Sequence, residues 1–200
     1  QEGAYAEKIA IKAAIVARKT ASLSHVDAAA LALAGLTAIC AVEDTLKLKA
    51  GETILIQGGA GGVASFAIQL AKHLGARVIT TASASNHDYV SNIGADEIID
   101  YNAADFTKVV KDCDAVFDTV GGDVAQRSFA VLKPGGRAAF IASGAQAPTP
   151  DRRDVVGWRP SAGRHQPHPP RSVALVAGGA GPTPEPAAAY PAHGRACSRA

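Results

Sequence analysis

Four glycines lie within the five residues Gly58 to Gly62, and an alanine-rich run follows them directly. The stretch Gly59-Ala60-Gly61-Gly62-Val63-Ala64 matches the pattern G-x-G-x-x-G/A, after a strand-like run and before a helix-like one. We expect Gly59 to allow the tight turn, Gly61 to let the backbone approach a pyrophosphate, and Ala64 to let helix and strand pack closely. Unpaired N–H groups at the helix start would face the phosphates. The segment predicts dinucleotide binding, with a ligand-free glycine-rich turn as the alternative.

The loop after the next strand-like run bears on the choice between NAD and NADP. NAD sites carry an acid at this point for the ribose hydroxyls. Here small hydroxyl and amide side chains follow the run, and no acid comes before Asp88. This composition favours NADP, although no Arg or Lys occurs between Arg77 and Lys108 to pair with a 2′-phosphate. A plain surface loop is the alternative.

These residues need a scaffold, and the chain from Ser22 to Gly144 alternates short β-rich runs with helical ones. Ser24 and Asp27 form a capping box for a helix that extends to about Leu46, with a break expected near Gly35. The pattern predicts an α/β fold, a doubly wound parallel sheet of five strands with four crossovers. The predicted strands are 53–56, 78–81, 97–101, 115–117 and 137–142, and the predicted helices between them are 63–74, 87–93, 106–111 and 123–132.

Beyond Ala147 the composition changes to Arg, Pro, Ala and Gly, and ten of the eleven prolines lie there. Such a segment buries too little apolar surface to offset its ordering entropy, so disorder is predicted for most of 151–200. The run 172–180 could form one strand or helical turn. A changed reading frame is one hypothesis for the shift. Because the chain begins at Gln1 and contains no Met, we also expect it to be a fragment.

Charge and apolar patterning disfavour several classes of partner. Residues 1–145 carry 13 basic and 15 acidic groups, a poor match to nucleic acid. The nearly uncharged stretch 28–42 is shorter than the ~20 residues of a membrane span, and we expect it to be a buried helix. The N-terminus lacks the pattern of a secretory signal. Three widely spaced cysteines fit reduced thiols, so a cytoplasmic location is expected.

Six motifs occur in an order and spacing that resemble a known family. They are GAYAEKIAIKAAIVARK, LAGLTA, GETILIQGGAGGVASFAIQLAKHLGARVITTAS, GADEIIDY, VFDTVGG and LKPGGR, and they cover roughly the first 145 residues. In this respect the chain resembles the zinc-independent quinone-oxidoreductase branch of the medium-chain dehydrogenase/reductase superfamily. The resemblance implies NADPH-dependent hydride transfer to quinones or α,β-unsaturated carbonyls. It also implies three parts: a remnant of an N-terminal GroES-like domain (1–21), a Rossmann domain (22–145) and an irregular tail (146–200).

The resemblance also implies roles for individual residues. The pyrophosphate would be held by Gly59, Gly61, Gly62 and Val63, while Ser83 and Tyr101 would lie near the 2′-phosphate. The nicotinamide side would be bordered by Thr37, Val120, Gly121 and Ala142. The chain departs from the family pattern in three places: Ala64 replaces a third glycine, Ser85 stands where a basic residue is frequent, and the pattern is lost after Gly144.

No metal site is predicted. Zinc-dependent cousins place a cysteine ligand where this chain has Ala34, and Cys40 is expected to pack inside a helix. The histidines are isolated, and the acidic group around Asp96 is expected to be a solvated face. Asp118 could border the cleft or fix the turn before the glycines that follow it. The catalytic residues stay unassigned, because hydride transfer in this family needs orientation and a dry pocket more than a side-chain acid.

The sequence is compatible with two other functions. A methyltransferase that uses S-adenosylmethionine shares a glycine-rich first turn and an LKPGGR-like turn, but usually has an acid after its second strand. A nucleotide-binding remnant or scaffold without catalysis is the non-enzymatic alternative. Relatives commonly form dimers through this domain, so a homodimer is a further expectation.

Overall fold

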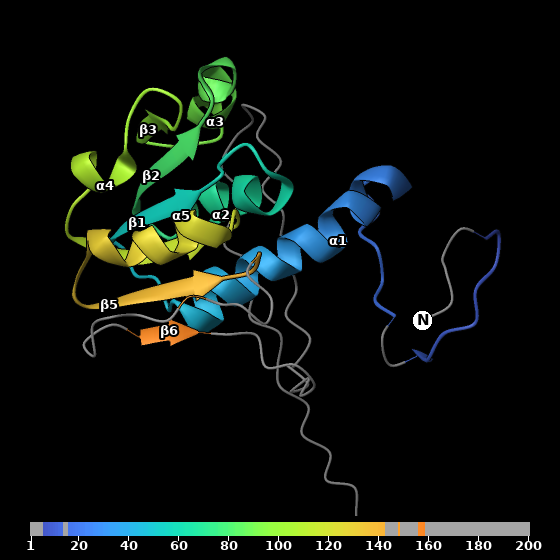
Figure 1. Cartoon of the computed structure of the whole chain (residues 1–200). Coiled ribbons are helices and arrows are strands. Elements are labelled where there is room, and N and C mark those ends of the chain that lie inside the picture. Colours follow the sequence, from blue (N-terminus) through green and yellow to red (C-terminus); the bar gives the residue numbers. More distant parts are fainter. Residues whose placement is uncertain (1–5, 14–15, 143–147, 149–155, 159–200) are drawn as a thin grey trace, which may run out of the picture. The chain divides into compact units, whose positions relative to one another are not determined.

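Six parallel strands form the centre of the fold, and their spatial order is β3-β2-β1-β4-β5-β6 (Figure 1). The computed structural model describes residues 6–13, 16–142, 148 and 156–158, all within one compact unit that spans 1–164. The strands are β1 (Thr53–Gln57), β2 (Arg77–Ala82), β3 (Glu97–Asp100), β4 (Cys113–Asp118), β5 (Leu132–Phe140) and β6 (Val156–Trp158). The chain order reverses between β1 and β4, as in a doubly wound sheet, so the predicted α/β class is confirmed.

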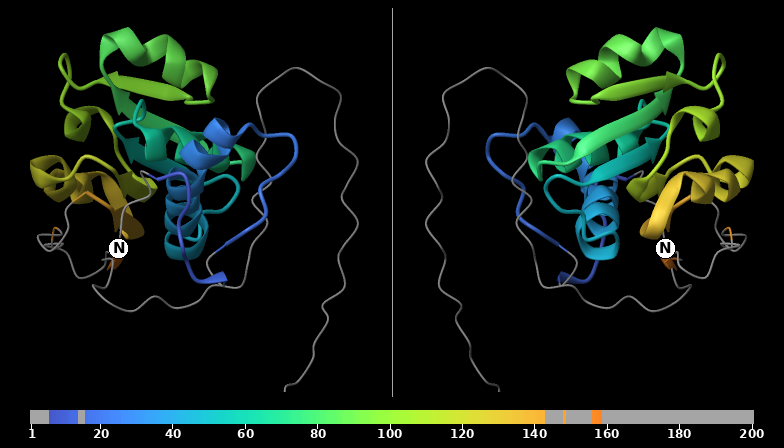
Figure 2. Two further views of the ribbon diagram at one scale, coloured as in Figure 1. Left: turned by 90° about the vertical axis from the view of Figure 1, so that its right-hand side faces the viewer. Right: turned by 90° about the vertical axis from the view of Figure 1, so that its left-hand side faces the viewer.

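Helices connect the strands and cover both faces of the sheet (Figure 2). The α-helices are α1 (His25–Ile39), α2 (Gly62–His73), α3 (His87–Asn92), α4 (Phe106–Val109) and α5 (Gly122–Arg127). Three tighter or wider turns join them, namely the π-helix η2 (Cys40–Thr45) and the 3₁₀-helices η3 (Ala84–Asn86) and η4 (Ser128–Val131). Each crossover therefore returns the chain to the same edge of the sheet, where the next parallel strand begins.

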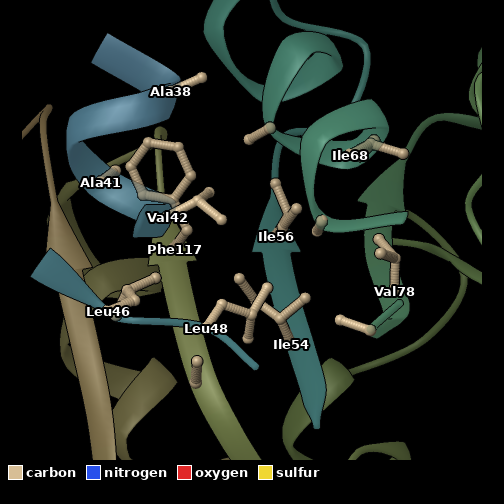
Figure 3. Packing of buried hydrophobic residues seen from close by; sticks show 14 of the residues in the cluster. Ala38, Ala41, Val42, Leu46, Leu48, Ile54, Ile56, Ile68, Val78 and Phe117 are labelled. Atoms are coloured by element: carbon tan, nitrogen blue, oxygen red, sulfur yellow. The ribbon is translucent and has the colours of Figure 1, made fainter. Parts of the chain in front are cut away.

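Alternate residues of the strands supply two apolar cores. Ile54, Ile56 and Phe117 point to the face that α1, η2 and α2 cover, and Figure 3 shows them beside side chains of those helices. Leu55 and Val116 point to the opposite face, toward α4, α5 and η4. A strand buried on both faces has apolar residues at successive positions, which explains the uninterrupted run Ile54-Leu55-Ile56 in β1. Burial of each such side chain stabilises the fold by about 1.5–3 kcal/mol.

The prediction of five strands is corrected by a sixth. Strand β6 pairs in parallel with β5, with Arg137 opposite Val156 and Ala139 opposite Trp158, inside the stretch predicted to be disordered. The composition argument considered only apolar burial, whereas β5 offers a row of backbone N–H and C=O groups that three residues of any composition can satisfy. The rest of the predicted disorder, and the run 172–180, lie outside the described residues.

The predicted turn at 133–136 lies inside a strand. Leu132 already pairs with Cys113, and the register then shifts so that Arg137 pairs with Ala115. The extra residues form a bulge in which Gly135 has a φ of 75°, a value that glycine adopts without strain. Proline and glycine therefore interrupt the ladder here without ending it.

The first helix also differs from its prediction. Ser24 caps it as expected, since its Oγ accepts a hydrogen bond from the N–H of Asp27 at 3.0 Å. No break occurs at Gly35, and the helix instead widens into η2 at its end. The stretch expected to be a buried helix, 28–42, is buried only in part: Gly35, Ala38, Ala41 and Val42 are buried, whereas Leu33 and Leu36 are 78% and 54% exposed. Apolar composition indicates that a helix needs a partner surface, but not where that surface lies.

Within the described residues, one helical stretch is long and apolar enough to cross a membrane, namely His25–Thr45. Length and composition alone make this weak evidence, because core helices of soluble proteins pass the same test.

Candidate functional site

The glycine turn joins β1 to α2 at the carboxyl edge of the sheet. Its left-handed residue is Gly58, with a φ of 73°, one position before the Gly59 to which the tight turn is assigned from sequence. Gly59 lies against β2, where its N–H donates to the carbonyl of Thr81 at 2.9 Å and an added Cβ would collide with Thr80 Oγ1. Glycine is therefore required at position 59 by the closeness of β2, and at position 58 by the backbone conformation.

The helix after the turn begins in open space. Gly61 is the N-cap residue and provides no side chain to bond the first N–H groups, which also lack partners within the helix. A Cβ built on Gly62 meets no atom within 4 Å. Ala64 is fully buried against the sheet, as its small size predicted. The start of α2 thus offers backbone donors and the positive end of a 12-residue helix to an anion.

A second turn borders the glycines on the side of β4. Asp118 ends this strand, and its carboxylate accepts hydrogen bonds from the N–H groups of Val120 at 3.1 Å and Gly121 at 2.9 Å. Burial raises the pKa of Asp118, and these two N–H donors oppose that rise. Of the two roles considered for Asp118, the structure supports the fixing of this turn. Thr119 Oγ1 ties the turn to β1 by donating to the carbonyl of Gln57 at 2.8 Å.

A cavity of about 700 Å³ lies beside these turns. The ends of β1 and β2, the segment 101–106 after β3, and Val120, Val124 and Arg127 form its walls. The Arg127 guanidinium forms an ion pair with Asp105 and lies 5.2 Å from the centre of the Phe106 ring. It also approaches Asp123 at 3.5 Å. The positive charge in this wall is therefore already balanced by carboxylates.

The loop after β2 carries a small cluster of polar groups. Ser83 Oγ lies 3.1 Å from Ser85 Oγ and accepts a hydrogen bond from Asn86 Nδ2 at 2.9 Å. Ser85 is exposed, and Ser83 is half-buried. The cluster presents hydroxyl groups, without a carboxylate that would repel an anionic ligand.

The structure brings some of the predicted site residues together and separates others. Gly59, Gly61, Gly62 and Val63 all lie at the β1–α2 turn. Tyr101 and Val120, predicted at opposite ends of a dinucleotide, line the same cavity. Gly121 and Ala142 are neighbours, since a Cβ on Gly121 would lie 3.1 Å from the Cβ of Ala142. Thr37 lies on α1, where its hydroxyl donates to the carbonyl of Leu33 at 2.8 Å.

Several lining residues were not predicted. Gln57 and Thr81 are polar residues at the ends of otherwise apolar strands, and both are almost fully buried. Their polarity at a buried strand end was a signal that could have identified them. Arg127 follows Val124 by three residues on α5, so helical spacing places them on one face. The wall formed by 102–106 carried no comparable signal, because its position depends on tertiary packing.

Among the described residues, no group of three His, Cys, Asp or Glu side chains could hold a metal ion. The cysteine of β4, Cys113, is buried, and burial together with the nearby charge of Asp114 raises its pKa to about 12. That thiol is not a nucleophile at neutral pH.

Comparison with known proteins places this arrangement in a family. The family model described as zinc-binding dehydrogenase matches residues 62–161, half of the chain. The chain belongs to this family. Its branch is the quinone-oxidoreductase-like branch of the medium-chain dehydrogenases/reductases. Since the match extends to residue 161 and includes β6, the chain follows the family beyond Gly144, where the pattern was expected to be lost.

Individual members of the family support this assignment. A 2-methylene-furan-3-one reductase from Solanum lycopersicum is 39% identical over 158 residues, which cover 78% of this chain and 39% of the reductase. A quinone oxidoreductase from Coxiella burnetii is 37% identical with a TM-score of 0.62, over 72% of this chain and 47% of that one. A mycobacterial protein solved with NADPH is 31% identical with a TM-score of 0.67, over 74% of this chain and 50% of that one. The chain thus spans about half or less of the length of these dehydrogenases.

Proposed function

We propose that this dehydrogenase chain binds NADPH, and that the whole protein transfers hydride from it to a quinone or an α,β-unsaturated carbonyl. The observation that carries the proposal is the uncapped start of α2, which lies open beside Gly62 and follows a glycine turn held against β2. A pyrophosphate fits such a place, because backbone N–H groups and the helix dipole both favour an anion. The main-chain groups of Gly59, Gly61, Gly62 and Val63 would hold it.

The preference for NADPH over NADH rests on the loop after β2. The hydroxyls of Ser83 and Ser85 and the amide of Asn86 can donate hydrogen bonds to a 2′-phosphate. An acid in their place would repel it. We assign Ser83 to the 2′-phosphate on this basis, and the NADPH-bound mycobacterial relative is consistent with this coenzyme.

The cavity beside the turns suits the adenosine half of the coenzyme. It lies at the carboxyl ends of β1, β2 and β4, the position at which open α/β sheets bind ligands. Tyr101 and Val120 provide apolar surface there, and the charge of Arg127 is balanced by Asp105, so a neutral base fits better than a second phosphate. Gly121 and Ala142, at the ends of β4 and β5, would then border the nicotinamide half. Thr37 on α1 would lie on that side as well.

The chemistry requires little acid or base from this chain. NADPH supplies a hydride, and the protein has to hold the nicotinamide near an electrophilic carbon and exclude water. Asp118 is occupied by the N–H groups of its own turn, so it orients a loop and is not proposed as a proton donor. We propose that the reaction proceeds without zinc, because Ala34 stands where the resemblance places a cysteine ligand in zinc-dependent cousins.

Titration calorimetry of the chain with NADPH and NADH tests the binding step. We expect NADPH to bind more tightly, and equal affinities would contradict the role of Ser83. Consumption of NADPH in the presence of 1,4-benzoquinone or 3-buten-2-one, with and without a zinc chelator, tests the reaction. Because this chain spans half or less of its relatives, turnover is measured on the whole protein; binding of NADPH without turnover there favours a second candidate, a nucleotide-binding module without catalysis.

Three further expectations complete the proposal. Residues 1–21 are assigned to the end of a GroES-like domain, 22–145 to the dinucleotide-binding domain and 146–200 to a tail. The protein is proposed to act in the cytoplasm as a homodimer, without nucleic-acid or membrane partners. Size-exclusion chromatography with light scattering tests the dimer, and a monomeric mass at all concentrations would exclude it.

A further inference from the structure

A series of four hydrogen bonds begins at the glycine turn and connects four elements, β2, β1, η4 and α5. The N–H of Gly58 donates to Thr81 Oγ1 at 3.0 Å, and Thr81 Oγ1 donates to Gln57 Oε1 at 2.7 Å. Gln57 Nε2 donates to Ser128 Oγ at 3.1 Å, and Ser128 Oγ donates to the carbonyl of Val124 at 2.8 Å. The chain thus crosses from the first residue of the turn, through β2 and β1, to α5.

All four bonds run in one direction, and this constrains the residue types. Thr81 donates its single hydroxyl proton to Gln57, so its oxygen remains to accept from Gly58. Ser128 donates to Val124, so its oxygen remains to accept from Gln57. Position 57 therefore has to accept at one end and donate at the other, which a side-chain amide does and a carboxylate or an alkyl group does not.

The hydrogen-bonded side chains are buried, and Gln57 and Thr81 border the proposed coenzyme cavity. Gln57 is 1% exposed, Thr81 3% and Ser128 0%. Buried polar groups of this kind are costly to leave unpaired, so the bonds specify one arrangement of the elements that carry them. Those elements meet at the cavity, since both Gly58, which begins the glycine turn, and Val124 line it.

We propose that Gln57 is a positioning residue for coenzyme binding. Gln57 is linked by Thr81 to the N–H of Gly58, and by Ser128 to the carbonyl of Val124 in α5. It therefore fixes the position of the glycine turn relative to Val124, which also lines the cavity. The inference rests on the proposed binding of NADPH, and it assigns Gln57, Thr81 and Ser128 a role through their hydrogen bonds to one another, although Gln57 and Thr81 also line the cavity. The expected signature is weaker binding of NADPH without loss of the fold.

Two pairs of variants of the full chain test the proposal. Gln57→Met keeps the volume of the side chain and removes the hydrogen bonds of this residue with Thr81 and Ser128. We expect the Kd for NADPH to rise about tenfold. Thr81→Val should have the same effect, whereas Thr81→Ser keeps both the donor and the acceptor and should bind as the unchanged chain does. Val131→Ala is the matched control. Val131 lies three residues after Ser128 and is also buried, but its side chain takes no part in these hydrogen bonds.

A second measurement separates positioning from stability. Amide exchange of Gly58, followed by NMR, should become faster in Gln57→Met and Thr81→Val than in Val131→Ala at equal global stability, and should remain slow in Thr81→Ser. Unchanged Gly58 exchange, equal NADPH affinity of Thr81→Val and Thr81→Ser, or a loss of affinity in Val131→Ala as large as in Gln57→Met would each overturn the inference. Failure of the unchanged chain to bind NADPH would instead overturn the proposed function, and the Gly58 exchange would still decide whether the hydrogen-bond chain holds the turn.

Discussion

The two ends of the strands in the parallel sheet, the amino edge where the strands begin and the carboxyl edge where they end, are stabilised by different interactions. At the amino edge, four carboxylates pair with cations: Glu52 with Arg137 at 2.6 Å, Asp114 with Lys133, Asp96 with Lys72 at 2.7 Å, and Glu97 with Arg77 at 2.6 Å. At the carboxyl edge, the glycine turn is held by neutral groups, namely the hydroxyls and the amide that bond Gly58 and the hydroxyl of Thr119, and the turn after β4 is held by the Asp118 carboxylate through backbone N–H groups. Ion pairs at the amino edge lie at the end of the sheet away from the proposed anion site. Hydrogen bonds between neutral groups hold the glycine turn without adding a charge, so the positive end of α2 remains available to an anion.

The largest effect is expected from placing a charge at the carboxyl edge. Gly62→Asp puts a carboxylate at the start of α2, where a Cβ has open space and an acid is favourable to the helix dipole. The fold should therefore remain, while repulsion of the pyrophosphate should weaken NADPH binding by about 100-fold or more, the equivalent of ~3 kcal/mol. Titration calorimetry measures the affinity, and thermal unfolding measures the stability.

Gly62→Ala is the matched control for this change. It fills the same open space without charge and should bind NADPH within about threefold of the unchanged chain, less than 1 kcal/mol. An aspartate variant that binds NADPH normally would show that the start of α2 does not face the pyrophosphate, and it would remove the functional side of the comparison between the two edges.

Features that depend on local sequence were predictable, and features that depend on a partner elsewhere in the fold were not. Strands such as β1 were predictable because burial on both faces makes their central positions apolar, and the glycine turn because only glycine fits a φ of 73° or the approach of β2. Strand β6 was not, since its pairing depends on the free edge of β5 and not on its own composition. The exposure of α1 was missed for a related reason, because a helix sequence does not specify its partner.

The site was less predictable than the fold. The turn residues Gly61 and Gly62 can be predicted from a local pattern. The placement of Tyr101 and Val120 at the same cavity depends on the order of the strands, in which β3 and β4 lie on either side of β1 and β2. Arg127 gains its position from Asp105, which is 22 residues earlier in the chain. Contacts of this kind become visible only once the topology is known.

An intermediate effect is expected at the amino edge, from Asp114. Its carboxylate accepts from the N–H of Thr53 at 2.8 Å and pairs with Lys133. Burial raises its pKa, but the hydrogen bond from Lys133, the N–H of Thr53 and the charges of Lys133 and Arg137 outweigh this and leave the pKa below its ordinary value. Asp114→Asn should lower the free energy of unfolding by about 1.5–3 kcal/mol at neutral pH and leave NADPH binding unchanged.

The pH dependence of this loss has a definite sign. Because the folded pKa is lowered, the unfolded chain binds more protons in acid, so the contribution of Asp114 is complete above its ordinary pKa and disappears as the pH falls through the lowered one. In urea unfolding, the difference between the unchanged chain and Asp114→Asn should therefore be constant near neutral pH and shrink as the pH falls below about 5 and on through the lowered pKa. A difference that grows in acid would contradict the assignment.

The smallest effect is expected from an exposed ion pair of the same edge, Lys72 with Asp96. Both side chains are about one third exposed, at 36% and 35%, so solvent screens their attraction. Asp96 also accepts from the N–H of Val78 at 2.7 Å, a bond that does not need Lys72. Lys72→Met keeps the alkyl packing against Gly94 and removes the charge, and it should lower the free energy of unfolding by about 0.2–1 kcal/mol.

Salt separates the Lys72 pair from the packing beneath it. In urea unfolding, the loss caused by Lys72→Met should vanish at about 1 M NaCl, where the screening length is only about 3 Å. The loss caused by Asp114→Asn should persist in salt, because that carboxylate is largely buried and also bonds a backbone N–H. If salt abolished both losses alike, surface ion pairs would stabilise the amino edge. Hydrogen bonds from side chains to buried backbone would then stabilise the carboxyl edge only.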